Sequence, residues 1–170
     1  MTIKNIKITY DYQIFNGQRY GGISRYFFKL ANNIAQRDGV GASVFSPIYI
    51  NSYLSQASED LEVIGCKLPV IKGSWRLYKY FNKKFSPTKL ASLQPDIVHE
   101  TYYASIRSGS KKSRTVVTVY DMIHELFPSS FLKSDDTSYL KAKAVERADH
   151  VICISRKTQS DLIKIFKHQP

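Results

Sequence analysis

The chain has 170 residues, of which 43% are hydrophobic and 23% charged, and its formal net charge is +11. This composition excludes an intrinsically disordered chain, and the length fits one domain with a buried core. No apolar run is long enough to cross a bilayer, and residues 1–7 interleave lysines with isoleucines, unlike a secretory signal. Cys66 and Cys153 fit neither a metal site nor a disulfide framework. We expect buried free thiols in a reducing cytoplasm.

Hydrophobic periodicity predicts strands that alternate with helices along the chain. Strands are expected at residues 6–10, 40–45, 61–66, 96–99, 115–120 and 151–155. Helices are expected at 23–37, 74–85, 138–148 and 157–167, and a short helix or turn at 87–93. A polar loop is expected at 12–20, a mobile connection at 48–60 and a basic loop at 108–114. This alternation predicts an α/β fold with a mainly parallel sheet.

Polar groups follow several of the predicted strands. The carboxyl ends of parallel strands share one edge of the sheet, where ligands bind. That rule places Asp11, the Gly21-Gly22 loop, His99-Glu100, Tyr120-Asp121 and Ser155-Arg156 at one edge. The two adjacent glycines open a predicted helix, whose first N–H groups favour an anion such as a phosphate. The alternative for the glycines is a tight turn, and for Ser155 a helix N-cap.

Four ordered motifs resemble the amino-terminal half of the family 4 (group 1) glycosyltransferases. They are Gly21-Gly22-Ile23, residues 95–99 (PDIVH), residues 115–121 (TVVTVYD) running on to Phe127-Pro128, and residues 148–155 (ADHVICIS) with Thr158 and Asp161. The resemblance implies a Rossmann-like three-layer α/β/α domain, the acceptor-side half of a GT-B fold. It also implies retaining, hexosyltransferase-type transfer from a nucleotide-sugar to a saccharide acceptor, with no metal and no cofactor beyond that substrate.

The chain departs from the family pattern in two ways. It stops at Pro170, where such enzymes have finished only their first domain, so we expect that residues 1–170 lack the donor-binding domain and do not turn over alone. Many members also have a histidine where this chain has Tyr120. We therefore predict that Asp121 and His124 act together, with Tyr120 as a hydrogen-bonding substitute. The alternative for His124 is packing or capping within its loop.

The resemblance also suggests roles for the remaining residues at this edge. Gly21, Gly22, Arg25 and Ser155 are predicted to face the donor phosphate, and His99, Glu100, Tyr102 and Tyr103 to bind the acceptor sugar. The alternatives are a surface position for Arg25 and core packing for the two tyrosines.

The predicted helix at 74–85 carries aromatic and basic residues on separate sides. Trp75, Tyr78, Phe81 and Phe85 are expected on one side, and the membrane-facing set is Trp75, Arg76, Lys79, Lys83 and Lys84. No acidic residue occurs from 63 to 95. Aromatic and basic residues on one helix are typical of an interfacial helix, which fits a lipid-linked acceptor at the inner membrane face. The alternative is that the aromatics pack on the sheet.

Two other functional classes compete with the transferase. The net charge and the aromatics favour a nucleic-acid-binding domain, but no known recognition motif is present, so no nucleic acid is expected. A stand-alone nucleotide-binding domain would carry the G-x-G-x-x-G fingerprint, which the sequence lacks.

Overall fold

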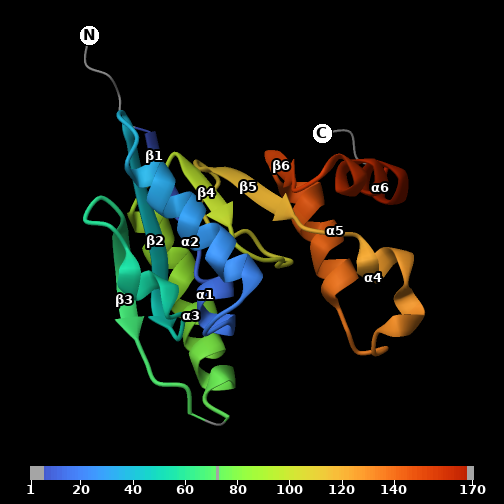
Figure 1. The fold of residues 1–170 in the computed structure, drawn as a ribbon, viewed down its shortest axis with the longest axis horizontal. Helices are drawn as coiled ribbons and strands as arrows, with labels where there is room; N and C mark the ends of the chain where they lie inside the picture. The colour runs from blue at the N-terminus through green and yellow to red at the C-terminus, as the bar shows by residue number, and fades with distance from the viewer. Residues whose placement is uncertain (1–5, 72, 168–170) are drawn as a thin grey trace.

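A six-stranded sheet forms the centre of the computed structural model, which describes residues 6–71 and 73–167, without the side chain of Trp75. The strands are β1 (Ile6–Tyr10), β2 (Val40–Tyr49), β3 (Glu62–Lys67), β4 (Ile97–Glu100), β5 (Arg114–Val119) and β6 (His150–Cys153). They lie in the order β3-β2-β1-β4-β5-β6, and every pairing is parallel (Figure 1). This is the doubly wound order, so the direction of winding reverses between β1 and β4, the point where such sheets bind ligands.

Helices connect the strands, as the sequence pattern predicts. They are α1 (Gln13–Gly17), α2 (Gly22–Ala35), α3 (Trp75–Ser92), α4 (Ile123–Leu126), α5 (Thr137–Arg147) and α6 (Arg156–Phe166), with 3-10 turns η1 (Tyr53–Gln56) and η2 (Pro128–Ser130). Within the described ranges, no helix combines the length and the apolar character that a membrane span requires.

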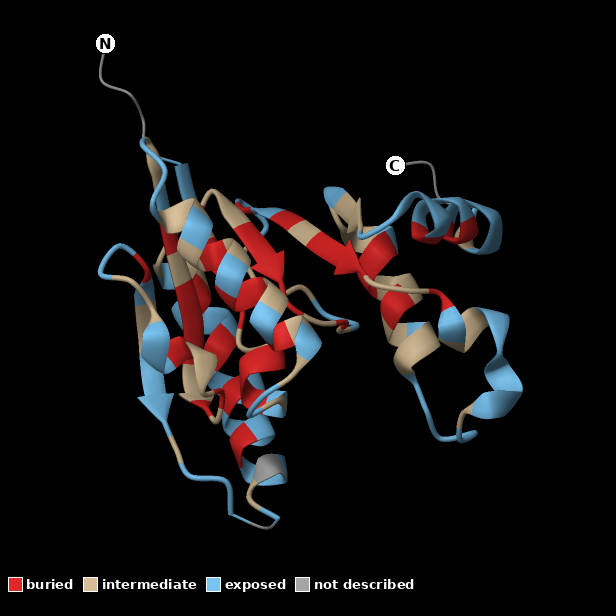
Figure 2. Ribbon diagram, in the orientation of Figure 1, coloured by how far each residue is buried: buried red, intermediate tan, exposed pale blue. Residues whose placement is uncertain are grey.

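The helices cover both faces of the sheet. Val44 and Tyr10 point toward α2, where they join a cluster built around Phe27. On the opposite face Phe45 and Val98 pack with Leu90 of α3. Further along that face, Val117 and Val119 of β5 pack with Ala144 and Val145 of α5. Figure 2 shows the buried residues along the strands and on the helix sides that face them. The predicted three-layer α/β/α arrangement is confirmed.

The second strand is longer than the sequence predicts. The Ser46-Pro47 pair was expected to end it, but β2 continues to Tyr49 because the pairing with β3 shifts register between Phe45 and Ile48. Gly65 of β3 makes this irregularity possible: its φ is +144°, and a Cβ there would lie 1.7 Å from the Ser46 carbonyl oxygen. Only glycine fits such a backbone conformation beside another main chain.

Other segments also differ from the sequence prediction. The predicted polar loop at 12–20 contains α1, and the connection at 48–60 contains η1. The two helices predicted at 74–85 and 87–93 are one helix, α3, with Pro87 inside it. Residues 123–130 form α4 and η2, which no periodicity indicated because the helical segments are so short. Cys66 is exposed rather than buried, since β3 is an edge strand, whereas Cys153 is half-buried.

Candidate functional site

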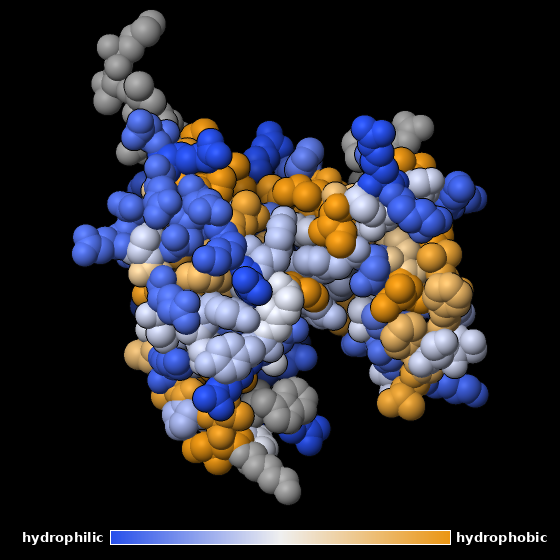
Figure 3. Space-filling view, viewed as in Figure 1, coloured by the Kyte–Doolittle hydropathy of each residue, from blue (hydrophilic) through white to orange (hydrophobic). Residues whose placement is uncertain are grey.

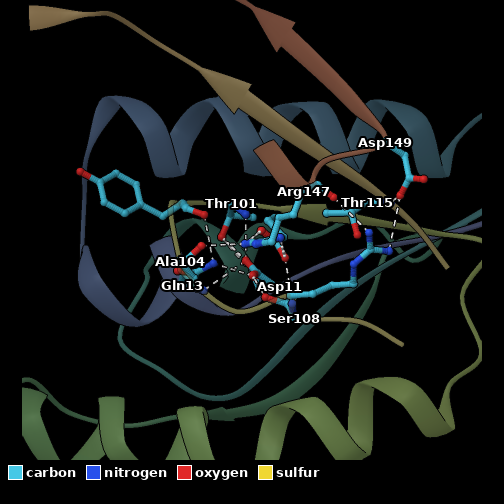
Figure 4. Close-up of polar contacts among 11 residues, drawn as sticks. Asp11, Gln13, Thr101, Ala104, Ser108, Thr115, Arg147 and Asp149 are labelled. Atoms are coloured by element: carbon cyan, nitrogen blue, oxygen red, sulfur yellow. Dashed lines mark hydrogen bonds and ion pairs between the residues drawn. The ribbon is translucent and has the colours of Figure 1, made fainter. Parts of the chain in front are cut away.

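A fully buried carboxylate occupies the point between β1 and β4. Asp11 directly follows β1, and its Oδ1 accepts hydrogen bonds from the Thr101 N–H (2.8 Å) and the Thr101 hydroxyl (2.6 Å). Its Oδ2 accepts from the Ser108 hydroxyl (2.6 Å) and from Gln13 Nε2 (2.8 Å). Figure 4 shows these side chains converging from both loops. Asp11 therefore links the end of β1 to the segment that follows β4, and its own carboxylate is not exposed at the surface.

Glu100, predicted to bind an acceptor sugar, is instead engaged within the chain. Its side chain is fully buried, and both carboxylate oxygens accept hydrogen bonds from Arg147 at the end of α5. The Ser108 N–H also donates to Glu100 Oε1 (2.8 Å). Burial raises the pKa of Glu100, and the Arg147 pairing opposes that rise. Glu100 thus anchors α5 to the sheet, and its binding of an acceptor stays a prediction.

His99, also predicted to bind the acceptor, lies in the core. Its ring stacks on Tyr10 (centroids 5.4 Å apart) and meets Phe27 edge-on (5.0 Å). The Nε2 atom lies 2.9 Å from the Thr118 hydroxyl oxygen. Burial lowers the pKa of His99 to about 4. A neutral, enclosed imidazole contributes packing beneath the site.

The start of α2 offers two unpartnered N–H groups. Gly21 is the N-cap, and the Gln18 side chain reaches over it to accept from the Ser24 N–H (3.3 Å). The N–H groups of Gly22 and Ile23 have no partner among the described residues, and no atom lies within 4 Å of a Cβ built on Gly22. Arg25 is exposed in the same turn. A helix start with available donors suits an anion.

Tyr120 joins the end of β5 to this helix start. Its ring lies edge-on to Tyr26 (6.1 Å between centroids) and to Phe27 (6.3 Å), both in the second turn of α2. The Tyr120 hydroxyl is buried without a hydrogen-bond partner, and burial raises its pKa. These contacts pack the end of β5 against the second turn of α2, one turn after the Gly21-Gly22 pair.

Asp121 is the more accessible group at this strand end. Its side chain is 47% exposed, and Oδ1 accepts from the Ile123 N–H (3.1 Å). Beneath it lies Lys141 of α5, only 1% exposed, whose Nζ donates to the Asp121 carbonyl (2.9 Å) and to Glu125 Oε2 (2.8 Å). The Lys141 ammonium also lies 5.6 Å from the Tyr103 ring centroid. Lys141 thus holds the segment that carries Asp121.

His124 packs against the segment that follows it. Its ring stacks on Phe131 (3.9 Å between centroids), and Nε2 lies 3.8 Å from Asp135 Oδ2. The Nδ1 atom is buried without a partner. His124 and Phe131 line a hollow of about 520 Å³ beside Phe166 of α6. These contacts fit the packing alternative for His124, and its pairing with Asp121 stays a prediction.

The two predicted acceptor tyrosines pack in the core beside β5. Tyr102 contacts both the cluster around Phe27 and the cluster that contains Val117, and Tyr103 belongs to the second. Tyr102 is half-buried and Tyr103 is buried, with their ring centroids 5.0 Å apart. Burial raises the pKa of both hydroxyls. The Tyr103 hydroxyl accepts from the Tyr120 N–H (3.5 Å), so it supports the strand end. Core packing, the alternative for these tyrosines, describes Tyr103 well.

Ser155 is the N-cap of α6, the alternative that the sequence left open. Its Oγ accepts from the Thr158 N–H (3.0 Å), and the Thr158 hydroxyl donates onward to the Tyr120 carbonyl (3.3 Å). Ser155 also lines a hollow of about 360 Å³ with Cys153 and Gln159. Ser155 therefore caps α6 and is still exposed at this edge of the sheet.

The predicted membrane-facing residues lie on α3. Arg76, Lys79, Lys83 and Lys84 are exposed, and the side chain of Trp75 lies outside the described part of the chain. The aromatic residues divide: Tyr78 is buried, whereas Phe81 and Phe85 are exposed. The aromatics therefore do not form the single side that was expected.

Sequence reasoning placed Asp11 at this edge without a role, and it missed Lys141 and Arg147. The roles of all three depend on contacts between separate segments. The only available signal was the position of Asp11 after a strand. Among residues 6–71 and 73–167, no three His, Cys, Asp or Glu side chains gather closely enough to hold a metal ion.

A comparison with protein families finds a match over most of the chain. The sequence profile described as Glycosyltransferase Family 4 matches residues 20–170. That range includes α2 and every strand from β2 to β6, and so most of the edge described above. No curated protein matches the chain.

Proposed function

Since the chain belongs to glycosyltransferase family 4, we propose that it is the acceptor-side domain of a retaining enzyme that transfers a hexosyl group from a nucleotide-sugar to a saccharide. The acceptor is lipid-linked and the reaction is cytoplasmic in this proposal. The nucleotide-sugar is a substrate, and no resident cofactor or metal is invoked.

The contact between Tyr120 and α2 carries the proposal. It joins the second turn of α2 to the strand end before Asp121, and the available N–H groups of Gly22 and Ile23 lie one turn earlier on the same helix. The N–H groups suit a phosphate, and the Asp121 carboxylate suits a sugar hydroxyl. Transfer between a sugar phosphate and a hydroxyl needs both at once.

The residues on this edge suit a retaining transfer. The acceptor hydroxyl approaches the face from which the phosphate leaves, so the leaving phosphate takes the hydroxyl proton. The Gly22 and Ile23 N–H groups donate to the developing phosphate charge, and one such donor stabilises a transition state by on the order of 3 kcal/mol. Arg25, exposed in the same turn, adds positive charge. Asp121 orients the acceptor hydroxyl.

Amide NMR of the 170-residue chain tests this assignment. Titration with nucleoside-diphosphate sugars is expected to shift the Gly22, Ile23 and Asp121 amide signals first. The same sugars without phosphate should leave Gly22 and Ile23 unshifted. In Gly22→Ala the added methyl group blocks close approach, so binding weakens, while Gly41→Ala serves as the control because its Cβ also meets open space. Shifts confined to the hollow beside His124 would contradict the proposal.

A further inference from the structure

The hollow beside His124 contains two buried polar atoms that lack partners among the described residues. Glu125 lines this hollow, whose volume is about 520 Å³, and its side chain is only 3% exposed. Lys141 donates to Glu125 Oε2 (2.8 Å), whereas Oε1 has no hydrogen-bond partner in the described part of the chain. His124 Nδ1 is also buried without one. Since a buried polar atom normally has a partner, these two atoms mark a place where a ligand can supply it.

Both atoms need a hydrogen-bond donor. An ionised carboxylate only accepts hydrogen bonds. His124 Nε2 lies 3.8 Å from Asp135 Oδ2, which favours the ring proton on Nε2 and leaves Nδ1 as an acceptor. A ligand that satisfies both atoms therefore carries several donor hydrogens. A primary ammonium group fits this requirement, because it offers donors and no acceptor.

The segment around the hollow is acidic within a basic protein. Residues 121–141 contain four acidic and two basic residues, whereas the whole chain has a formal net charge of +11. Glu125 and Asp135 both line the hollow, together with the basic Lys133. The second basic residue, Lys141, is already paired with Glu125 (2.8 Å). This balance of charge favours a cationic ligand over an anionic one.

Apolar side chains form much of the remaining wall. Pro128 and Phe131 line the hollow from the segment after α4, and Ile165 and Phe166 line it from α6. Leu132 also lines it and is 80% exposed. Figure 3 shows apolar surface on the right-hand lobe of the molecule, which carries α4, α5 and α6 in Figure 1. A hollow of this size suits a small molecule, and these side chains would remove its apolar body from water.

We propose that the hollow is a binding site for a small organic ammonium ion with an apolar body. The ammonium group donates to Glu125 Oε1 and His124 Nδ1, and the apolar body packs on Phe131 and Ile165. A neutral saccharide also offers donor hydrogens, but the acidic surroundings add nothing to its binding. These residues carry the inference by themselves, without the transferase proposal.

Lys141 connects the proposed site with the segment that carries Asp121. Its ammonium group donates both to Glu125 Oε2 and to the Asp121 carbonyl (2.9 Å). A ligand that binds Glu125 Oε1 restrains the Glu125 side chain, and through Lys141 it also restrains the backbone at Asp121. Occupancy of the hollow is therefore expected to slow amide hydrogen exchange at residues 121–126.

Amide NMR with a matched set of probes tests the proposal on the 170-residue chain. The probes are 2-phenylethylammonium, its neutral analogue 2-phenylethanol, its anionic analogue 3-phenylpropionate, and methyl glucoside as the saccharide. The ammonium probe is expected to shift the Glu125, Phe131 and Ile165 amide signals. Its affinity should exceed that of 2-phenylethanol about tenfold, because hydrogen bonds to a charged group are the stronger ones. The anionic probe should bind least.

Two isoleucines of α6 supply a matched pair of variants. Ile165 lines the hollow and is 36% exposed, whereas Ile163 is 37% exposed and does not line it. The indole of Ile165→Trp fills the hollow, so the affinity for 2-phenylethylammonium should fall at least about tenfold. Ile163→Trp should bind the probe as the parent chain does. Both changes leave the Lys141–Glu125 pair intact, and thermal melting shows that both variants are folded.

Lys141→Met gives a second, independent measurement. This change leaves the Glu125 carboxylate buried without its cation. The ammonium probe can replace that cation, so it should bind Lys141→Met more tightly than the parent chain and raise the melting temperature of the variant. The neutral 2-phenylethanol should do neither. Glu125→Gln/Lys141→Met, which removes both charges, should lose the preference for the ammonium probe.

Three results would overturn the inference. The first is equal affinity of the parent chain for the ammonium probe and for 2-phenylethanol, or no binding of either. The second is methyl glucoside that shifts the Glu125 and Phe131 signals while the ammonium probe does not, because the hollow would then be a saccharide site. The third is equal binding of the ammonium probe by Ile165→Trp and Ile163→Trp.

Discussion

Glu100 and Arg147 form a two-point ion pair that joins the end of β4 to the end of α5. Arg147→Met would leave the carboxylate of Glu100 buried without its cation, so we expect unfolding to become easier by about 3–5 kcal/mol. Urea denaturation measures this loss. The double variant Glu100→Leu/Arg147→Met should be more stable than Arg147→Met alone, because no unpaired charge remains.

An exposed ion pair supplies the control for that experiment. Arg114 pairs with Asp149 (2.9 Å), but the Arg114 side chain is 78% exposed. Arg114→Met should therefore cost no more than about 1 kcal/mol. Equal losses for Arg114→Met and Arg147→Met would contradict a special role for the buried pair.

His99 makes stability depend on pH. Burial lowers its pKa to about 4 from the model-peptide value of 6.5. Between these two values the unfolded chain binds a proton that the folded chain does not, so stability falls as the pH falls from 6.5 toward 4. At about pH 5 this group alone lowers the free energy of unfolding by about 2 kcal/mol relative to neutral pH.

Comparison of His99→Gln and His99→Phe with the parent chain isolates that contribution. Urea denaturation at several pH values should show a shallower loss of stability toward acid in both variants. Glutamine keeps a hydrogen-bonding partner for Thr118, and phenylalanine keeps the ring packing on Tyr10. An unchanged pH dependence in both variants would mean that His99 is not the responsible group.

Lys141 holds the Asp121–Glu125 segment from below. Lys141→Met removes the donor to the Asp121 carbonyl and leaves Glu125 buried without its cation, which should cost about 3–5 kcal/mol. Lys143→Met on the same helix is the control, since Lys143 pairs with Glu146 at the surface. Hydrogen exchange is expected to increase at residues 121–126 in Lys141→Met only. Uniform exchange increases throughout the chain would refute a local role.

Substitution by alanine is expected to destabilise the fold at Gly65 and to stabilise it at Gly41. Gly65→Ala places a methyl group against the Ser46 carbonyl in a backbone conformation that alanine avoids, so a loss of at least about 2 kcal/mol is expected. Gly41→Ala meets no atom within 4 Å and should gain about 0.5 kcal/mol from reduced chain entropy. Thermal unfolding of both variants tests this difference.

Tyr120→Phe separates stability from ligand binding. The hydroxyl is buried without a partner, and its removal should leave stability unchanged or raise it by about 1 kcal/mol. If Tyr120 hydrogen-bonds the substrate, the same variant binds saccharide acceptors more weakly. Calorimetric melting and acceptor titration measure the two effects. A clear loss of stability would show that the hydroxyl has a structural partner.

The sequence pattern predicted the strands well, because local periodicity reports which side chains are buried. β1 was predicted with its observed bounds, and the parallel order placed Tyr120 and the Gly21-Gly22 turn at one edge. Contacts between distant residues escaped prediction. Nothing in the local sequence shows that Asp11 meets Ser108, or that α3 would bury Asn82 with Tyr78 and leave Phe81 and Phe85 exposed.

The side-chain roles at the edge were harder to predict than its position. A strand end is recognised locally, but the direction of each side chain alternates along the strand. His99 therefore faces α2 and Glu100 faces α5, both within the core. The Asp121 side chain, just after β5 has ended, is 47% exposed.

The Asp11 network has a consequence for the order in which the protein assembles during synthesis. Thr101 and Ser108 follow Asp11 by 90 and 97 residues, so the ribosome makes the carboxylate long before these two donors. β1 leaves the ribosome before the other five strands of the described sheet, yet it lies in the interior of that sheet between β2 and β4. Asp11 is thus translated well before Thr101 and Ser108, and a nascent chain that stalls before residue 101 exposes an acidic group that the finished protein conceals.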